Sequence, residues 1–400
     1  MTRSARQASW QARLPSASPY DLALFRIVVC AMVLAYADVG LAEYLSALPD
    51  DLRAASPSAS FPLAWLPIDP TAVAVAGWLL RGGALLGLVG WLTRPALIVA
   101  TLAALYVLGV TQLFGSVAHH HHLLWFLAIL AASPCADVLS LDARGSAPTS
   151  PSAAYGVPVW TARAVIAVIF FFPGLWKLLE SGSAWMLSDN LQNQIHWKWY
   201  QHQAVSWLRV DRVPYLCNVL AGATVAFELS FPLLLTSPRW RHRAAYAAVL
   251  FHLGTELVMH VSFASLWPCY IVLIDARRIA LVLAGVLPRS LTARVRWCLR
   301  HGSRAHRWRP APALAVAALL VVGNAAHGAL GNTQAWPLAC YPTFQWLAGD
   351  RIVHLSVDEV RPDGSVHIID LRPRGQKDWS LQWSVIGATH AFDRDRLAAY

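Results

Sequence analysis

The stretch FFFPGLWKLLESGSAW, residues 170–185, closes an apolar run and then introduces a lysine. The run is typical of the last part of a membrane-spanning helix, predicted over 158–179, and Pro173 and Gly174 interrupt it. Lys177 follows at a position where lipid or packed protein is expected. A charged side chain inside an apolar segment costs free energy, so a functional role is the first hypothesis.

The composition is that of a polytopic membrane protein. Hydrophobic residues make up 56% of the chain and charged residues 14%, whereas a soluble domain has roughly 25% charged residues. The net charge of +10 does not indicate a nucleic-acid partner, because the basic residues lie in short stretches between apolar runs. The six cysteines form no CxxC pair, so we expect small buried side chains and no metal or redox motif.

Apolar windows divide most of the chain into membrane spans, each of which needs about 20 residues. They are predicted at 20–42, 72–92, 95–114, 120–139, 158–179, 215–236, 243–261, 263–286 and 312–331. We therefore expect an all-α polytopic membrane bundle of about nine transmembrane helices over residues 1–331, embedded in a lipid bilayer.

The positions of the basic residues predict the orientation of this bundle. With the N-terminus inside, nine spans put most loop arginines on the cytoplasmic side, including an arginine-rich stretch between 277 and 309. Cytoplasmic loops collect Lys and Arg, so the N-terminus is predicted inside and the C-terminus outside.

The last part of the chain has a different pattern. Apolar and polar residues alternate on both sides of Asp363-Gly364, which predicts a β-hairpin. We expect residues 332–400 to form a small β-rich domain on the outer side, packed on the membrane bundle because it is short for a free-standing core.

Two groups of ionisable residues are predicted at the outer side. The four consecutive histidines His119 to His122 begin the fourth span, and Lys177 ends the fifth, so the two groups could face one cavity. Successive helical residues turn by about 100°, so at most two of these histidines serve one site. A histidine as proton donor or hydrogen-bond partner is favoured over a metal site, and no metal is predicted.

Lys177 has two interpretations. A lysine desolvated in an apolar place has its ammonium form disfavoured and can act as a base near neutral pH. Alternatively, it forms an ion pair with Glu180 on the same helix face or extends to the membrane interface.

Other polar residues in predicted spans have similar alternatives. His252 and Glu256 share one helix face and either support a site or satisfy each other. Arg26 and Arg81 either line a polar cavity, extend to the interface or bond a backbone carbonyl. Nucleotide-binding, esterase and zincin motifs do not occur in the sequence, whereas its 19 tryptophans could form interfacial belts or wall a flat quinone-like ligand.

Several segments together resemble one family, the vitamin K-dependent gamma-carboxylases. PGLWKLLESGSAW (173–185) resembles the segment in which a glycine, a lysine, a leucine and a tryptophan, here Trp185, mark the catalytic lysine. LALFRIVVCAMVLAYADV, HHHHLLWFLAILAASPCADVLSLD and FHLGTELVMHVSFASLWPC resemble three other family segments in the same order. The likeness covers roughly residues 20 to 275 and is greatest to the bacterial branch with the horizontally transferred transmembrane (HTTM) domain.

The resemblance implies a site and a reaction. Lys177 takes the place of the base that deprotonates vitamin K hydroquinone, and His121 most nearly that of the active-site histidine, with His120 and His122 as neighbouring registers. The implied cofactors are a reduced vitamin K or menaquinone-type hydroquinone, O2 and CO2. Oxidation to the epoxide would accompany carboxylation of a peptide or protein on the outer side of a bacterial cytoplasmic membrane.

Some residues depart from the family pattern. Trp176 stands where the animal enzyme has a second lysine, Thr255 stands where it has asparagine, and the outer domain is far shorter. We therefore expect hydroquinone oxidation or epoxidation more than protein carboxylation. The alternative is a non-catalytic membrane protein, a transporter or an assembly factor, that reuses the scaffold.

Overall fold

The structure is a computed structural model that describes residues 14–47, 67–113, 120–143, 150–275, 279, 310–332, 335–338, 343–351 and 357–369. It is mostly helical. Its elements are α2 (Pro19–Tyr36), α3 (Val39–Ser46), α4 (Pro70–Val89), α5 (Thr93–Leu113), α6 (His122–Ala131), α7 (Ala153–Ser181), α8 (Ala184–Leu187), α9 (Asn190–His202), η3 (Val210–Arg212), α10 (Leu216–Leu234), α11 (Pro238–Met259), η4 (Trp267–Leu273), α14 (Pro310–Ala329), β1 (Val357–Val360) and β2 (Val366–Ile369).

Within the described residues, six helical segments are long and apolar enough to cross a membrane, which makes the chain a multi-pass membrane protein by the length and composition of its helices. They are Pro19–Ser46, Pro70–Val89, Thr93–Gln112, Ala153–Ser181, Leu216–Leu234 and Pro310–Ala329. These correspond to the first, second, third, fifth, sixth and ninth predicted spans.

The other three predicted spans differ from expectation. The fourth contains only the ten-residue helix α6, since a proline at 134 follows and disfavours helix in the residue before it. The seventh is the 22-residue helix α11, whose first two turns carry arginines and lower its apolar character. Of the eighth, residues 263–275 and 279 are described; the short helix η4 lies among them, and the rest of the span is outside the described part. The described residues therefore do not show nine full transmembrane helices.

Local sequence signals explain where helices begin. Ser18 and Asp21 form a capping box at the start of α2, with Pro19 in the first helical position. The carboxylate of Asp69 accepts a hydrogen bond from the backbone N–H of Ala72 at the start of α4. The expected break at Pro173 and Gly174 does not end α7, which continues to Ser181. A proline removes only its own N–H donor, and packing against neighbouring helices keeps the remaining turns helical.

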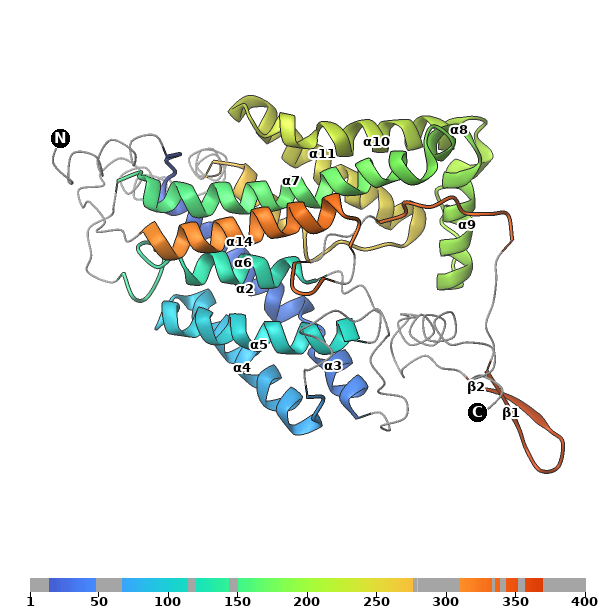
Figure 1. The fold of residues 1–400 in the computed structure, drawn as a ribbon, viewed down its shortest axis with the longest axis horizontal. Helices are drawn as coiled ribbons and strands as arrows, with labels where there is room; N and C mark the ends of the chain where they lie inside the picture. The colour runs from blue at the N-terminus through green and yellow to red at the C-terminus, as the bar shows by residue number, and fades with distance from the viewer. Residues whose placement is uncertain are drawn as a thin grey trace.

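The long helices lie roughly alongside one another, and α9 crosses their direction at one end (Figure 1). At the opposite end, the backbones of Ala17 and Ser152 pair and join the beginnings of α2 and α7. We call this the Asp275 end, because Asp275 binds Arg241 near the start of α11 there. The other end, where α7 finishes and α8 and α9 lie, is the Lys177 end.

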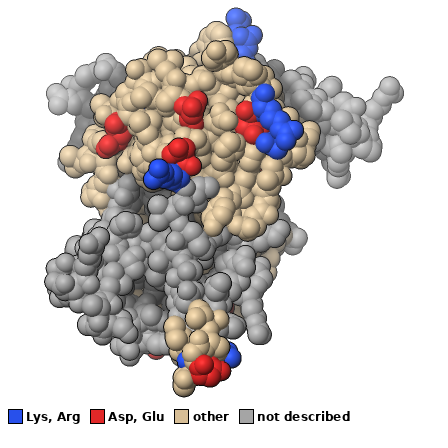
Figure 2. Space-filling view, turned by 90° about the vertical axis from the view of Figure 1, so that its right-hand side faces the viewer, with Lys and Arg blue, Asp and Glu red and all other residues tan. Residues whose placement is uncertain are grey.

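The sides of the bundle expose large apolar side chains, as a surface in contact with lipid does. Examples are Trp78 on α4, Leu102 on α5, Leu233 on α10 and Val322 on α14, all exposed. At the Lys177 end, Figure 2 shows that charged residues occupy only a few separate places on the described surface.

The strands β1 and β2 pair in antiparallel register, with Val357 opposite Ile369 and Val360 opposite Val366. Gly364 has φ of 79° and Asp363 accepts a hydrogen bond from the Ser365 N–H, so the turn lies where its residues predicted it. The hairpin lies on the Lys177 side in Figure 1. Most other residues of the expected β-rich domain lie outside the described residues, so that domain stays a prediction.

Candidate functional site

A close crossing of α7 and α10 positions the central pair of the site. A Cβ atom added to Gly174 would lie 2.8 Å from the Cβ of Glu228 and 3.3 Å from its Oε2. Glycine therefore lets α10 approach α7 at this level, one turn before Lys177. The helix break expected from Pro173-Gly174 is instead a contact point between two helices.

Lys177 and Glu228 form a buried ion pair across this crossing. The Lys177 Nζ donates to both carboxylate oxygens of Glu228, each at 2.9 Å. The side chains are 3% and 7% exposed, so the pair is largely withdrawn from water. The Nζ also lies 5.2 Å from the ring centroid of Trp185, a cation–π distance. Desolvation of two charges is costly, and the bidentate geometry offsets part of that cost.

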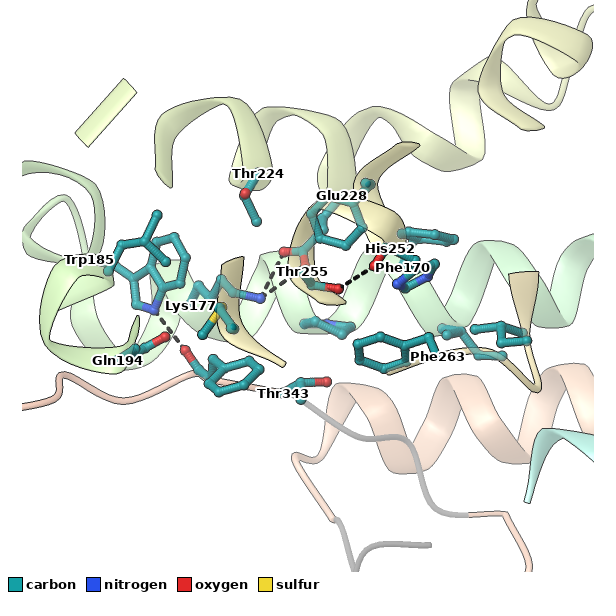
Figure 3. A pocket seen from close by; sticks show the side chains of 17 residues that line it. Phe170, Lys177, Trp185, Gln194, Thr224, Glu228, His252, Thr255, Phe263 and Thr343 are labelled. Carbon is teal, nitrogen blue, oxygen red and sulfur yellow. Dashed lines mark hydrogen bonds and ion pairs between the residues drawn. The ribbon is translucent and has the colours of Figure 1, made fainter. Parts of the chain in front are cut away.

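A cavity of about 100 Å³ adjoins the pair. Figure 3 shows Lys177 and Glu228 facing each other, with Trp185 and Gln194 on one side and His252, Phe170 and Phe263 on the other. The other residues that line the cavity are Ile169, Pro173, Leu191, Thr224, Phe251, Thr255, Met259, Leu266, Thr343 and Phe344. The wall is thus mainly aromatic and aliphatic, with one cation and one carboxylate.

His252 is the histidine that lines this cavity. Its Nε2 lies 2.7 Å from the Tyr270 hydroxyl oxygen, and both residues are buried. Its ring centroid lies 4.4 Å from that of Phe263 and 5.5 Å from that of Phe170. The His252 Nδ1 is buried and has no hydrogen-bond partner among the described residues. One ring nitrogen is therefore fixed by Tyr270, and the other is buried without a hydrogen-bond partner in the described part of the chain.

The four consecutive histidines lie in different surroundings. His120 joins two other segments: its Nε2 lies 3.2 Å from Asp38 Oδ2, and its Nδ1 lies 2.8 Å from Ser265 Oγ. His121 is buried beside Trp125 and Trp336, and His122 is buried beside Phe126. His119 lies outside the described residues. The described lining of the Lys177 cavity includes none of His120 to His122, so the structure does not bring His121 together with Lys177 there.

The expected partners of Lys177 and His252 are replaced by others. Glu180 is exposed, and the acid that pairs with Lys177 is Glu228. His252 bonds Tyr270, and no hydrogen bond or ion pair joins it to Glu256 in the described part of the chain. Trp185, which the resemblance places in the same segment, lies beside Lys177.

Arg26, Arg81 and Trp176 lie elsewhere. Arg26 is fully buried and donates through Nη2 to the backbone carbonyl of Leu139, so the carbonyl interpretation is confirmed. The guanidinium of Arg81 lies over Trp78, 5.9 Å from the ring centroid. Trp176 donates its indole N–H to the carbonyl of Gly328 and thereby packs α7 against α14.

Sequence reasoning missed Glu228 and the segment at 343–344. Glu228 is the one acidic residue of the apolar helix α10, and this isolation was a usable signal, because an ionisable residue within a span calls for a named partner. Thr343 and Phe344 carry no comparable signal, since they follow α14 in a segment without helical or strand periodicity.

Comparisons of the chain with protein-family models, with curated proteins and with solved structures gave no match.

Proposed function

We propose that this protein is an integral membrane enzyme that oxidises or epoxidises a hydroquinone of the vitamin K or menaquinone type with O2. The observation that carries the proposal is a buried lysine–carboxylate pair beside an aromatic-walled cavity. Intramembrane charged pairs commonly mark proton pathways or substrate sites, and flat apolar ligands are bound by aromatic walls with a few polar groups.

The Lys177–Glu228 pair has the chemistry of a proton acceptor. Transfer of one ammonium proton from Nζ to the carboxylate gives a neutral amine and a carboxylic acid, without net charge in a low-dielectric site. The amine then takes the hydroxyl proton of the hydroquinone, which leaves an aryloxide next to the ammonium. The proton lost by the substrate thus remains on the pair, and the ammonium stabilises the anion.

The aryloxide is the species that reacts with O2. The balanced reaction is hydroquinone plus O2 giving quinone epoxide plus water; simple oxidation would give quinone plus hydrogen peroxide. A movement of the lining that exposes the buried His252 Nδ1 would let it bond a second hydroxyl or carbonyl group of the substrate, because this nitrogen has no partner in the described part of the chain. Carboxylation with CO2 of a peptide or protein presented at the Lys177 end rests on the family resemblance alone.

The size of the cavity bears on the fit of this substrate. A cavity of about 150 Å³ accepts one benzene ring, and the cavity beside Lys177 has about 100 Å³. The lining chemistry suits a fused-ring hydroquinone, whereas the volume requires the cavity to widen before two rings enter. Binding of this substrate therefore depends on a movement of the lining.

We also propose that the protein lies in a bacterial cytoplasmic membrane with the Asp275 end inside. The starts of α2 and α7 pair at that end, and Arg163 of α7 and Arg241 near the start of α11 both approach Asp275. Arginine at that end of the bundle supports an inside position. The cavity then lies toward the outer leaflet.

The test is hydroquinone-dependent O2 uptake by purified full-length protein in detergent, with non-enzymatic oxidation subtracted. A short-chain reduced menaquinone is the substrate. We expect Lys177→Ala to lower the rate by about 100-fold or more, because the base is lost. Glu180→Gln, at an exposed position three residues away, should change it by less than about twofold. Wild-type protein without uptake above the blank, or Lys177→Ala with near-normal uptake, would overturn the proposal.

A structural role for the pair is the second candidate, in which the protein is a non-catalytic transporter or assembly factor. The observation that favours it is the bidentate contact, which satisfies both charges without any ligand. In that case the wild-type protein would show no hydroquinone-dependent uptake.

A further inference from the structure

The segment 343–348, which we call the strap, passes over the Lys177 end of the cavity. Thr343 and Phe344 line the cavity itself. The strap follows α14 in the chain and is neither helix nor strand. Its attachment to the rest of the protein therefore depends on contacts other than regular secondary structure.

Side chains from the end of α7, from α8 and from α9 hold the backbone of the strap. Each of these hydrogen bonds involves a strap N–H or carbonyl and not a strap side chain. They are Ser181 Oγ to Gln345 O at 2.9 Å, Trp185 Nε1 to Phe344 O at 2.7 Å, Gln194 Nε2 to Trp346 O at 3.1 Å, Asn193 Nδ2 to Ala348 O at 3.0 Å and Ala348 N to Asn190 Oδ1 at 2.7 Å.

The outward side chains of the strap are not part of a core. Trp346 is 53% exposed and Leu347 is 48% exposed. Apolar packing thus contributes little at Trp346 and Leu347, where the polar contacts hold the strap, whereas Phe344 packs against two buried apolar clusters. Hydrogen bonds of this kind give a small net stabilisation, because water replaces them when the segment lifts.

Phe344 adopts a strained backbone conformation. Its φ is 59°, in the left-handed region that is unusual for a bulky residue. This conformation accompanies two contacts: its carbonyl accepts from Trp185, and its ring lies 5.6 Å from the Lys198 Nζ. Strained residues of this type occur at ligand clamps and switch segments, where surrounding contacts maintain them.

We propose that the strap is a movable cover of the Lys177 cavity and that Phe344 determines the size of the molecule that enters. Closed, the strap leaves a space too small for two fused rings. Opened, it removes Thr343 and Phe344 from the lining and frees the strain at Phe344. The role of the strap in substrate entry rests on the function proposed above, whereas its control of access to the cavity does not.

The test measures access directly, without turnover. Met259 lines the cavity and is buried, so Met259→Cys places a thiol inside it. The rate at which N-ethylmaleimide labels this thiol is measured on full-length protein in detergent. Unmodified protein supplies the background from the native cysteines.

Loosening the strap should speed labelling. In the Met259→Cys background, Asn193→Ala removes one strap hydrogen bond and should raise the rate several-fold. Asn190→Ala removes the bond to Ala348 N together with contacts inside α8–α9, and should raise it by about tenfold. Asn218→Ala is the matched control, because Asn218 bonds the carbonyls of Met186 and Ser188 and not the strap. It should change the rate by less than twofold.

Phe344→Gly tests the size limit. Glycine accepts a positive φ without strain and removes the ring, so labelling by the bulkier N-(1-naphthyl)maleimide should increase more than labelling by N-ethylmaleimide. Equal labelling rates in all strap variants and the control would overturn the proposal, whether those rates are all fast or all undetectable. Strap-dependent labelling without O2 uptake would instead reject the hydroquinone function and keep the cover.

Discussion

The two ends of the helix bundle both contain charged groups, but they use them differently. At the Asp275 end, Arg241 and Arg163 approach one carboxylate oxygen of Asp275 at 2.8 and 3.8 Å. The same arginines donate through Nε to the carbonyls of Leu273 and Val272. At the Lys177 end, the charges of Lys177 and Glu228 meet each other beside a cavity.

The difference shows which feature distinguishes a candidate site from a structural clamp. The arginines connect α7 and α11 to the end of η4. The Asp275 side chain is 39% exposed, so water partly solvates its charge. Lys177 and Glu228 have no such access to water, and the space next to them is large enough for a ligand group. Charge within a membrane protein is therefore a weaker indicator of function than charge next to an aromatic-walled cavity.

The largest predicted difference in stability is between two variants, each of which removes the carboxylate of an ion pair at one end of the bundle. Glu228→Leu leaves the Lys177 ammonium buried without its carboxylate, and should lower the free energy of unfolding by about 3–5 kcal/mol. Asp275→Asn should cost less, about 1–2 kcal/mol, because the side chain at 275 is partly exposed, its amide oxygen can still accept a hydrogen bond from Arg241, and both buried arginines keep their bonds to backbone carbonyls. Thermal unfolding in one detergent compares the two. Equal losses would remove the distinction between the ends.

A second prediction concerns the helix crossing that builds the pair. Gly174→Ala places a methyl 2.8 Å from the Glu228 Cβ, so α10 must shift, at a cost of about 1–3 kcal/mol. Gly222→Ala on α10 is the matched control, because no atom lies within 4 Å of the added Cβ. It should be neutral or stabilising by up to about 1 kcal/mol. A Gly174→Ala protein as stable and active as Gly222→Ala would show that close approach is not required.

The smallest effect is expected at Asp142, where α5 begins. Burial alone would raise the pKa of Asp142, but hydrogen bonds from Thr93 and Leu92 outweigh it and leave the pKa below its ordinary value. Asp142→Asn should therefore cost about 0.3–1 kcal/mol at neutral pH, as for a carboxylate at a helix N-terminus.

The sign of the pH dependence follows from the lowered pKa. The stabilisation by Asp142 is complete above the unfolded-state pKa of about 3.9 and is lost as the pH falls through the lower folded-state pKa. Unfolding temperatures of wild type and Asp142→Asn should thus differ at pH 6 and converge as the pH falls below about 4. A difference that grows on acidification would contradict this assignment.

The sequence predicted the helical membrane architecture and part of the site. Long apolar windows located the six spanning helices, and the isolated charge at Lys177 located a buried pair. The local signal failed at Gly174, where a tertiary contact decides the outcome, because this residue is the crossing point for α10. At α6 the apolar composition predicted a longer helix than the one that forms before Pro134.

The partners in the site required the three-dimensional structure. Glu228 lies 51 residues from Lys177 in the chain, and Phe344 comes from a segment after the last spanning helix. Helical spacing can pair Lys177 only with neighbours such as Glu180, so it selects the wrong acid. That His252 and not His121 lines the cavity likewise depends on how α11 packs against α7 and η4.

The most direct test of the central claim replaces the whole pair. Lys177→Met with Glu228→Leu leaves no unpaired charge, and apolar replacements of a buried pair are often neutral or stabilising. Unfolding temperature and hydroquinone-dependent O2 uptake are measured on the same purified sample. If the pair moves the proton, the double variant unfolds at or above the wild-type temperature, yet its O2 uptake falls by about 100-fold or more. A double variant that keeps both its stability and near-normal uptake would contradict the account.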